Sequence, residues 1–536
     1  MFQPVLDFGS HSAYAVALLP EILLAVVAMF ILLLEAFRLR RSNGRSGRWT
    51  GGMALLAVLA AGGANTALIG AQVLGGPGAV SVDGFQTFAT FVILGAAAVA
   101  ILFSGDYLER EDLQTGEFYA LLLLATVGMM LLAVARDLML LFVSLELMSI
   151  SVYVLTGIDR KRAASSEAAL KYFLMGAFAS AFLLYGIALV YGATGSTNLT
   201  AAREALGLAV GRDSVLLRAG VGLLLVGFGF KVAAVPFHMW TPDAYEGAPT
   251  PVTGLMATGV KAAAFVALIR VIVVDLGPAA TTWRPILWWL AMLTMIVPNL
   301  VALAQDRVKR MLAYSSVAHA GYLLVGVTAG SALGMSAALF YLAVYTLMTL
   351  GAFGIVYYVE GQGDRHGRLA DFRALGWRHP VAGLALVVFL LSLAGFPPTG
   401  GFVGKLYLLR AAVDSGQLAL ALTLVLTSLV SYSYYFRVIW KMYFEATLPE
   451  APELESPRTE FRLATGLCML GVLGLGFAPG PLLRSVSGVG LELGTPSAVI
   501  RTDIRDIADH SNPGSGGAAA RPATSEFEAT PGSPGR

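Results

Sequence analysis

The chain has 536 residues, of which 57% are hydrophobic and 13% are charged, with a net charge of +2. Soluble proteins carry about 25% charged residues, so this composition indicates an integral membrane protein. The near-neutral charge gives no sign of nucleic-acid binding, and no glycine-rich phosphate loop follows a plausible strand. The single cysteine, Cys468, excludes a disulfide framework, an iron–sulfur cluster or a cysteine-based zinc site formed by this chain alone.

Apolar runs of about 20 residues predict fourteen transmembrane helices, because a helix of that length spans a hydrocarbon core of about 30 Å. The expected spans in chain order are 17–37, 51–73, 85–104, 118–135, 138–157, 168–191, 216–237, 251–274, 284–304, 311–330, 335–358, 380–412 (interrupted), 416–440 and 461–482. The predicted fold class is therefore an all-α polytopic membrane protein. No basic segment precedes the first run, so we expect a first helix and not a cleaved signal.

The loops on one side of these helices carry about three times as many Lys and Arg residues as those on the other. The basic side faces the cytoplasm, so both termini are expected on the outer face. No inter-helix loop is long enough for a soluble catalytic domain. From about Ser485 the composition changes, and we expect 485–536 to form a disordered tail without a core.

The stretch from 227 to 265 carries two lysines, Lys231 and Lys261, within otherwise apolar spans. A lysine at the centre of a spanning helix costs roughly 2.5–3.5 kcal/mol, which points to a function. Pro236 lacks a backbone donor, so the helix is expected to break just after Lys231 and to give the lysine access to water. A nearby carboxylate would make Lys231 a switchable proton site, and a static buried ion pair is the structural alternative.

Two further charged residues lie in the preceding helices. Glu146 is nine residues into the fifth span, near the membrane midplane, and shares a helix face with Ser149. An intramembrane carboxylate favours function, although a protonated Glu bonded to a neighbouring helix is the structural alternative. Lys171 lies about one turn inside the sixth span, where it can also reach the interface without any function.

The second half of the chain repeats this pattern. A Pro–Pro and Gly–Gly break interrupts the twelfth span, and Lys405 follows it near mid-membrane. Two interrupted helices in similar positions of the two halves are typical of inverted-repeat transporters. His319 lies at mid-depth in the tenth span, between the lysines. His238 lies beside the first break as a possible relay, although a hydrogen-bonded structural histidine fits equally well.

Three strings within this pattern resemble a known family: PFHMWTPDAYEGAPTPVTGLMATGVKAAAF, LAYSSVAHAGY and LAGFPPTGGFVGKLY. They resemble subunit N of the proton-translocating NADH–quinone oxidoreductases (respiratory complex I), within an antiporter-like family that includes multisubunit sodium/proton antiporters. The resemblance covers residues 15–482 and is most specific from 228 to 270. Sister subunits tend to have a histidine at the position of Tyr245, so DAYEGAPTPV favours the subunit N branch.

The resemblance implies two inverted five-helix repeats, formed by helices 4–8 and 9–13, with helices 7 and 12 broken. The corresponding segments are 1–117 for helices 1–3, 118–274 and 284–440 for the two repeats, and 461–482 for helix 14. It assigns proton-transfer positions to Glu146, Lys171, Lys231, Lys261 and Lys405. A chain of Glu146, Lys231, Lys261, His319 and Lys405 would run along the membrane, with water between neighbouring helices.

The same resemblance implies that this chain translocates protons as a translocase subunit of the respiratory chain, in a bacterial inner membrane. Flavin, iron–sulfur clusters and ubiquinone or another quinone are then expected in other subunits, with no cofactor or metal in this chain. The expected partners are the other membrane subunits of complex I, including the sister antiporter-like subunits, and the lipid bilayer. Two alternatives stay open: a stand-alone or multisubunit cation/proton antiporter, and an assembly subunit with an unused ion network.

Overall fold

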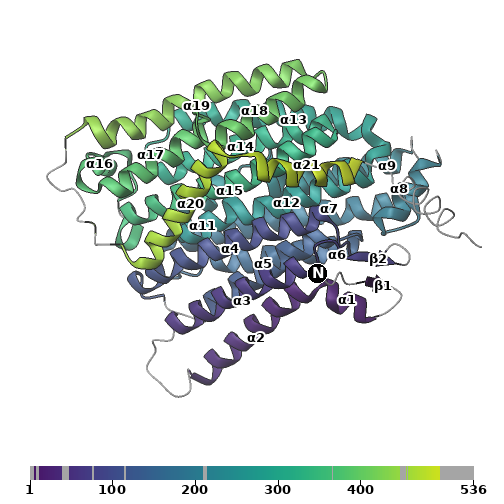
Figure 1. Cartoon of the computed structure of the whole chain (residues 1–536), viewed down its shortest axis with the longest axis horizontal. Helices are drawn as coiled ribbons and strands as arrows, with labels where there is room; N and C mark the ends of the chain where they lie inside the picture. The colour runs from purple at the N-terminus through teal and green to yellow at the C-terminus, as the bar shows by residue number, and fades with distance from the viewer. Residues whose placement is uncertain are drawn as a thin grey trace, which may run out of the picture. The chain divides into compact units, whose positions relative to one another are not determined.

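The computed structural model describes residues 5–7, 11–38, 47–74, 78–113, 116–208, 214–364, 366–446, 454 and 457–494. Residues 495–536, which hold most of the predicted tail, lie outside the described residues. Nearly all of the described chain is helical (Figure 1). The first elements are β1 (Val5–Asp7), α1 (His11–Ala17), α2 (Leu19–Arg38), α3 (Gly47–Ala67), β2 (Gln72–Leu74) and α4 (Gly84–Arg110). The two short strands pair in parallel, with Val5 opposite Gln72.

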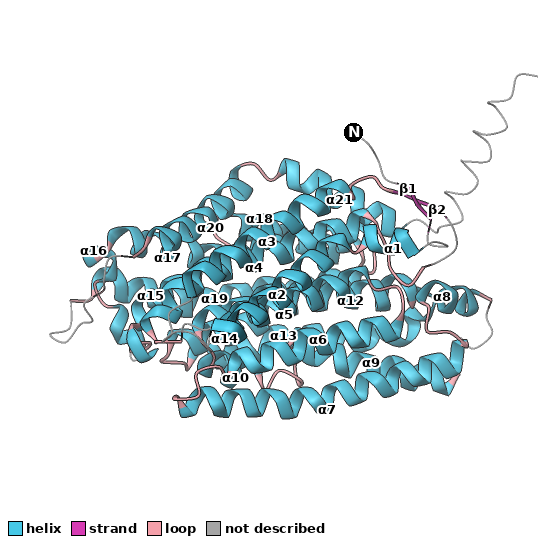
Figure 2. Cartoon of the chain, turned by 90° about the horizontal axis from the view of Figure 1, so that it is seen from below, coloured by secondary structure: helices cyan, strands magenta, loops and turns pink. Residues whose placement is uncertain are grey.

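The middle of the chain contains the predicted first repeat. Its elements are α5 (Gly116–Val134), α6 (Leu138–Thr156), α7 (Ala163–Thr194), α8 (Leu199–Gly207), α9 (Val215–Val232), α10 (Thr241–Gly247), α11 (Thr250–Leu255), η1 (Met256–Val260), α12 (Lys261–Leu268), η2 (Ile269–Asp275) and η3 (Gly277–Ala279). Helices α7 and α9 lie side by side along one face (Figure 2). Gly186 allows this contact, because a Cβ there would lie 2.8 Å from the backbone nitrogen of Leu224.

The remaining elements follow from residue 280. They are α13 (Ala280–Leu303), α14 (Val308–Ala329), α15 (Ala332–Glu360), η4 (Gln362–Asp364), η5 (Leu369–Phe372), α16 (Leu375–Arg378), α17 (Pro380–Ala394), α18 (Gly400–Asp414), α19 (Leu418–Phe444), α20 (Thr459–Phe477) and α21 (Gly480–Gly494). In both views the bundle of long helices carries α16 at one end and α8, β1 and β2 at the other. We call these the inner end and the outer end.

The predicted polytopic all-α fold is confirmed. Thirteen helical stretches of the described chain are long and apolar enough to cross a membrane. The remaining predicted span is divided between α17 and α18, and all fourteen predicted spans coincide with helices. The sidedness of the two termini stays a prediction.

Both predicted breaks are present. Helix α9 ends at Val232, five residues before the predicted boundary, because Ala233 adopts a left-handed conformation (φ 61°). The Ala234 N–H then bonds back to the Gly229 carbonyl at 2.7 Å, which closes the helix with a Schellman-type cap. Gly395 caps α17 in the same way, with φ 89°. Each break thus exposes backbone carbonyls inside the bundle.

The eighth span differs from the expected continuous α-helix. Two π-helical segments, η1 and η2, flank α12, and Lys261 is the first residue after η1. Such wide turns are rare and are frequent at functional sites. Their position next to a buried lysine marks this region as a candidate site.

The boundary predicted at Ser485 is wrong. Residues 480–494 form α21, which packs on α15 and α4. The buried side chains of Val486 and Val489 lie three residues apart on one helix face, and the Ser336 hydroxyl donates to the Val486 carbonyl at 3.0 Å. The glycines and serines of this segment made a short amphipathic helix difficult to recognise in the sequence. This helix, α21, follows the end of α20 at Phe477 and continues beyond the predicted boundary at residue 482.

Two isolated β-bridges support the inverted repeat. Asp137, before α6, pairs antiparallel with Asn198, after α7, at the outer end. Arg307, before α14, pairs antiparallel with Arg368, after α15, at the inner end. The second and third helices of each predicted repeat are therefore joined in the same way, at opposite ends of the bundle.

The packing of α5 on α6 depends on Gly128. A Cβ at this position would lie 2.5 Å from the backbone nitrogen of Met148, a distance that forces the helices apart. We expect Gly128→Ala to lower the free energy of unfolding by about 1–3 kcal/mol, as overpacking does, and to lower the thermal unfolding midpoint of the purified protein. The control is Gly95→Ala on α4, where a Cβ meets no atom within 4 Å. Equal midpoints for the two variants would contradict this packing.

Candidate functional site

The first cluster of the candidate site joins α6, α7 and α9. Lys231 is 3% exposed, and its Nζ donates to the Ser149 hydroxyl at 2.7 Å and to the Tyr153 hydroxyl at 3.1 Å. Glu146, one turn before Ser149, is half-buried and accepts a short hydrogen bond from Ser180. Among the described residues no ion pair within 4.0 Å joins Glu146 and Lys231.

The predicted direct pairing of Glu146 with Lys231 is therefore wrong for this conformation. The carboxylate is held by α7, while hydroxyls one and two turns further along α6 take the lysine. Glu146 and Ser149, the hydroxyl partner of Lys231, share one face of α6, since Ser149 lies three residues after Glu146. The carboxylate and the ammonium group therefore both contact the same helix face without a salt bridge between them.

The second cluster surrounds Lys261, which is 1% exposed. Its Nζ donates to the backbone carbonyl of Ser316 at 2.6 Å and also to the Ser316 hydroxyl. The same hydroxyl accepts from the Tyr345 hydroxyl at 2.8 Å, and Nζ lies 5.6 Å from the Tyr345 ring centroid. No carboxylate forms an ion pair with this lysine in the described part of the chain, so hydroxyl, carbonyl and ring electrons are its partners.

The third cluster contains His319, which is 1% exposed. Its Nδ1 lies 2.6 Å from the Tyr341 hydroxyl, and its Nε2 lies 3.2 Å from the Tyr435 hydroxyl. The imidazole ring lies 5.2 Å from the Tyr345 ring on one side and 5.2 Å from the Tyr322 ring on the other. His319 therefore has a tyrosine hydroxyl at each ring nitrogen. Its contact with the Tyr345 ring links the third cluster to the second.

Lys405 completes the third cluster. It is 6% exposed and lies in α18, five residues after the helix begins. Its Nζ donates to the Ala394 carbonyl at 2.9 Å, which is one of the carbonyls freed at the end of α17. The negative end of that half-helix dipole stabilises the ammonium group, as does the Tyr322 ring, whose centroid lies 4.8 Å from Nζ.

These contacts join Lys261 and Lys405, two of the four predicted lysines. Successive contacts run from Lys261 through Ser316 and Tyr345 to His319, and then through Tyr322 to Lys405. Between Lys231 and Lys261 the described side chains form no comparable series of hydrogen bonds. The contacts therefore agree with the predicted order Lys261, His319, Lys405 and leave the step from Lys231 to Lys261 without direct contacts among the described side chains.

Lys171 and His238 lie away from this series. Lys171 is 46% exposed and pairs with Glu167 at 2.7 Å and with Asp243 at 2.9 Å. Asp243 also accepts from Arg310 at 2.9 Å, and these side chains line a cavity of about 130 Å³ at the inner end. His238 lies in the break between α9 and α10, and its Nδ1 is buried without a hydrogen bond in the described structure.

Sequence reasoning missed a buried pair of oppositely charged residues on α14 and α15. Lys309 is 1% exposed and donates to the Ala248 carbonyl and the Thr250 hydroxyl, both at 2.8 Å. Thr250 in turn donates to Glu360 at 2.7 Å, and the Lys309 ammonium lies 3.9 Å from that carboxylate. Both charged residues sit next to predicted loops, so their positions suggested exposure. Only the folding of α10 and α11 over them buries the pair.

The tyrosine partners and Ser316 were also missed. Tyr153, Tyr341, Tyr345 and Tyr435 all lie on helix faces where an aromatic residue in an apolar run indicates core packing. Their hydroxyls, however, face Lys231, the ring nitrogens of His319 and the Ser316 hydroxyl that Lys261 contacts. The available signal was the spacing of Tyr341 and Tyr345, which places both rings on one face of α15.

The arrangement places groups that can gain and lose protons next to one another. Hydrogen bonds join Lys261 to Tyr345 through Ser316, and ring contacts join His319 to Tyr345 and Tyr322. The described residues contain no group of three or more His, Cys, Asp or Glu side chains that could hold a metal ion.

Comparisons with known proteins point the same way. Residues 135–431 match the family model for the transmembrane region of NADH:quinone oxidoreductase and Mrp antiporter proteins. The chain is 46% identical over 428 residues to NADH-quinone oxidoreductase subunit N of Trichlorobacter lovleyi, which covers 80% of this chain and 87% of the relative.

Two solved structures share the fold. A chain of respiratory complex I from Thermus thermophilus aligns with a TM-score of 0.74 and 37% identity, covering 87% of this chain and 99% of that chain. A chain of the membrane-bound sulfane sulfur reductase, an archaeal respiratory membrane complex, aligns with a TM-score of 0.78 and 25% identity, covering 90% and 98%.

The family match covers more than half of the chain, and the relative from T. lovleyi exceeds 30% identity over most of both sequences. The buried lysines and the two helix breaks lie within the matched region. The chain belongs to the NADH:quinone oxidoreductase/Mrp antiporter transmembrane family.

Proposed function

We propose that this chain is the subunit N type of membrane subunit in a proton-translocating NADH–quinone oxidoreductase. The observation that carries the proposal is the series of contacts from Lys261 through His319 to Lys405, buried within the bundle. Three buried amines without a carboxylate ion pair suit groups that gain and lose protons. Electron transfer takes place in other subunits.

In the proposed mechanism, a proton on Lys231 moves to Lys261 when the charge balance around Lys231 changes. Glu146 sets that balance from one turn away on α6, held meanwhile by Ser180. Water molecules carry the proton between the two lysines in this proposal. Neighbouring helix axes lie 8–10 Å apart, and water commonly bridges polar side chains across such a distance. The two clusters then exchange one proton for each change in the position of Glu146.

The next steps follow the contacts of the second and third clusters. Lys261 releases its proton through the Ser316 hydroxyl, His319 accepts it, and Lys405 passes it toward the outer end. Each unit by which the pKa of a proton donor falls below that of its acceptor corresponds to 1.36 kcal/mol, and moving one charge across 100 mV takes about 2.3 kcal/mol. Changes of two units per step are therefore of the right size.

Protons enter from the inner end in this proposal. Lys171, Asp243 and Arg310 line the cavity there, and His238 lies in the nearby break as a candidate relay. Lys171 therefore acts at the entrance and not in the membrane-buried series. The inner end faces the cytoplasm of a bacterial cell with an inner membrane, and both termini lie on the outer side.

The proposed partners follow from this role. Other membrane subunits of complex I, including sister antiporter-like subunits, lie beside this chain in the bilayer, and the complex as a whole reduces a quinone. In this proposal the flavin, the iron–sulfur clusters and the quinone site belong to the partner subunits. The printed names and titles of the relatives support membership of such a complex.

Substitutions of Lys231 and Glu146, the charged residues of the first cluster, test the mechanism. We expect Lys231→Met to reduce proton pumping by the assembled complex about tenfold or more, because Ser149 and Tyr153 lose the only ammonium group they contact. Glu146→Ala should reduce pumping as well. Proton uptake by vesicles is measured together with NADH oxidation. The matched control is Lys441→Met, a lysine at the inner end paired with Glu445. Full pumping by both cluster variants contradicts the mechanism.

His319→Phe tests the connection between the second and third clusters. The aromatic ring is kept, whereas the two nitrogens that contact Tyr341 and Tyr435 are lost. We expect pumping to fall about tenfold while the complex still assembles. His379→Phe, at a half-buried histidine near α16, serves as the control. A His319→Phe complex that pumps like the control would place the proton path elsewhere.

The family also includes Mrp antiporter proteins, so an antiporter is the second candidate. The purified chain, reconstituted alone into liposomes, is expected to exchange no Na⁺ for H⁺ under an imposed gradient, because the mechanism needs a neighbouring subunit to move Glu146. The readout is a pH-sensitive dye inside the liposomes. Robust exchange by the isolated chain would favour the antiporter.

A further inference from the structure

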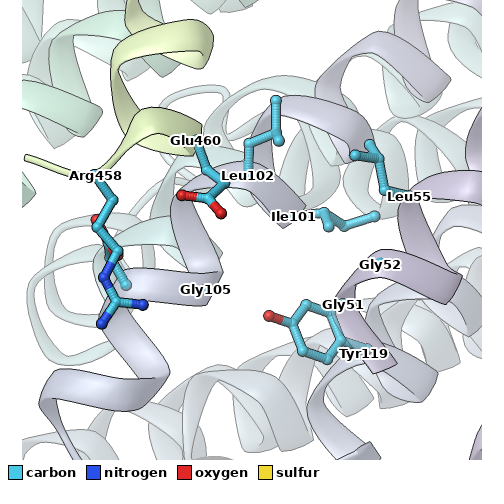
Figure 3. A pocket seen from close by; sticks show the side chains of 10 residues that line it. Gly51, Gly52, Leu55, Ile101, Leu102, Gly105, Tyr119, Arg458 and Glu460 are labelled. Carbon is cyan, nitrogen blue, oxygen red and sulfur yellow. The ribbon is translucent and has the colours of Figure 1, made fainter. Parts of the chain in front are cut away.

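A pocket lies outside the proton-transfer series, at the inner end, where α3 and α20 flank α4. Its volume is about 240 Å³, and Gly51 and Gly52 of α3, Gly105 of α4 and Tyr119 of α5 line it together with the polar groups at the start of α20 (Figure 3). Its apolar floor consists of Leu55, Ile101 and Leu102. The pocket thus has small and apolar residues on one side and polar residues on the other.

The charges at the pocket favour a cation. Arg458 pairs with Asp106 at 2.9 Å and with Glu109 at 2.5 Å. Glu460 also lines the pocket and forms no ion pair with any described residue. The two lining carboxylates, Asp106 and Glu460, against one guanidinium leave a formal charge of −1 at the pocket lining, which disfavours an anionic occupant. Figure 3 shows the Glu460 carboxylate pointing into the open space.

A second polar group points into the same space. Tyr119 is 2% exposed, and its hydroxyl makes no hydrogen bond to a described residue. The hydroxyl oxygen is open to the pocket, so it is available to donate a hydrogen bond to an occupant. In Figure 3 it points toward the centre of the pocket. The Nη2 atom of Arg458 carries no ion pair either, since the two carboxylates engage Nε and Nη1.

The helices beside the pocket present apolar side chains outward. Leu56 and Leu59 of α3 are 67% and 61% exposed, and Leu463 and Leu467 of α20 are 53% and 51% exposed. Trp49, at the inner end of α3, is 77% exposed, as expected for an aromatic residue at a membrane interface. The pocket therefore lies at headgroup depth, with hydrocarbon-facing surfaces leading away from it.

The position of the pocket favours a lipid occupant. It lies at headgroup depth, and the exposed leucines of α3 and α20 offer an apolar path for an acyl chain.

We propose that this pocket binds a phospholipid with a primary ammonium headgroup. The ammonium group faces Glu460 and Asp106, the phosphate accepts from Tyr119 and from Nη2 of Arg458, and one acyl chain runs over Leu55 and out along α3. A choline headgroup cannot donate hydrogen bonds to the carboxylates, and a glycerol headgroup leaves the lipid with a net negative charge.

The test uses the assembled complex and two leucine variants on one helix. At Gly52 an added Cβ meets no protein atom within 4 Å, so Gly52→Leu adds a side chain to the pocket lining with no clash at Cβ. Gly63→Leu is the matched control, since Gly63 lies on α3 with equally open space and does not line the pocket. Phospholipids retained by each purified complex are counted by mass spectrometry after exposure to phosphatidylethanolamine, phosphatidylcholine or phosphatidylglycerol.

We expect Gly52→Leu to lose a single bound phosphatidylethanolamine that Gly63→Leu retains. Glu460→Gln, which removes the charge at constant volume, should reduce the preference for ethanolamine over choline about threefold. A photo-crosslinking amino acid at position 52 should form a lipid adduct. Equal retention by both glycine variants, preferential retention of phosphatidylglycerol, or a crosslink to a neighbouring subunit would each overturn the proposal.

Discussion

The structure depends on holding three ammonium groups inside a bundle that spans a membrane. At roughly 2.5–3.5 kcal/mol each, Lys231, Lys261 and Lys405 together cost about 8–10 kcal/mol, as much as the net stability of a whole domain. Hydrogen bonds to a charged group contribute about 1.5–3 kcal/mol each, so five such bonds to hydroxyls and carbonyls offset this cost. The positions of these acceptors therefore constrain the surrounding helices.

The helix breaks and the π-helical segments supply these acceptors. The end of α17 gives Lys405 the Ala394 carbonyl, which a continuous helix would have used internally. The cap at Ala233 ends α9 directly after Lys231, so the lysine stands at a helix end inside the bundle. Lys261 follows η1, and the wider turn there accompanies its contact with the backbone of α14. Irregular backbone inside the bundle and buried charge thus occur together.

Much of this organisation could be predicted from the sequence. Apolar runs gave the helices, and proline and glycine gave the breaks, because both signals are local. The partners of the charges are not local. Tyr345 and Ser316 look like ordinary core residues until α14 and α15 meet α12, and Lys309 looks like a loop residue until α10 and α11 cover it. Tertiary contacts also redirected Glu146 toward Ser180 on α7, away from Lys231.

The central claim is that the buried amines carry protons and do not merely stabilise the fold. The most direct measurement compares Lys261→Met with the unaltered complex in sealed vesicles, recording NADH oxidation and proton uptake in the same sample. Methionine keeps much of the length of the side chain and removes the charge. The account predicts fewer protons translocated per NADH oxidised by a complex that assembles normally. An unchanged ratio of protons to NADH would contradict it.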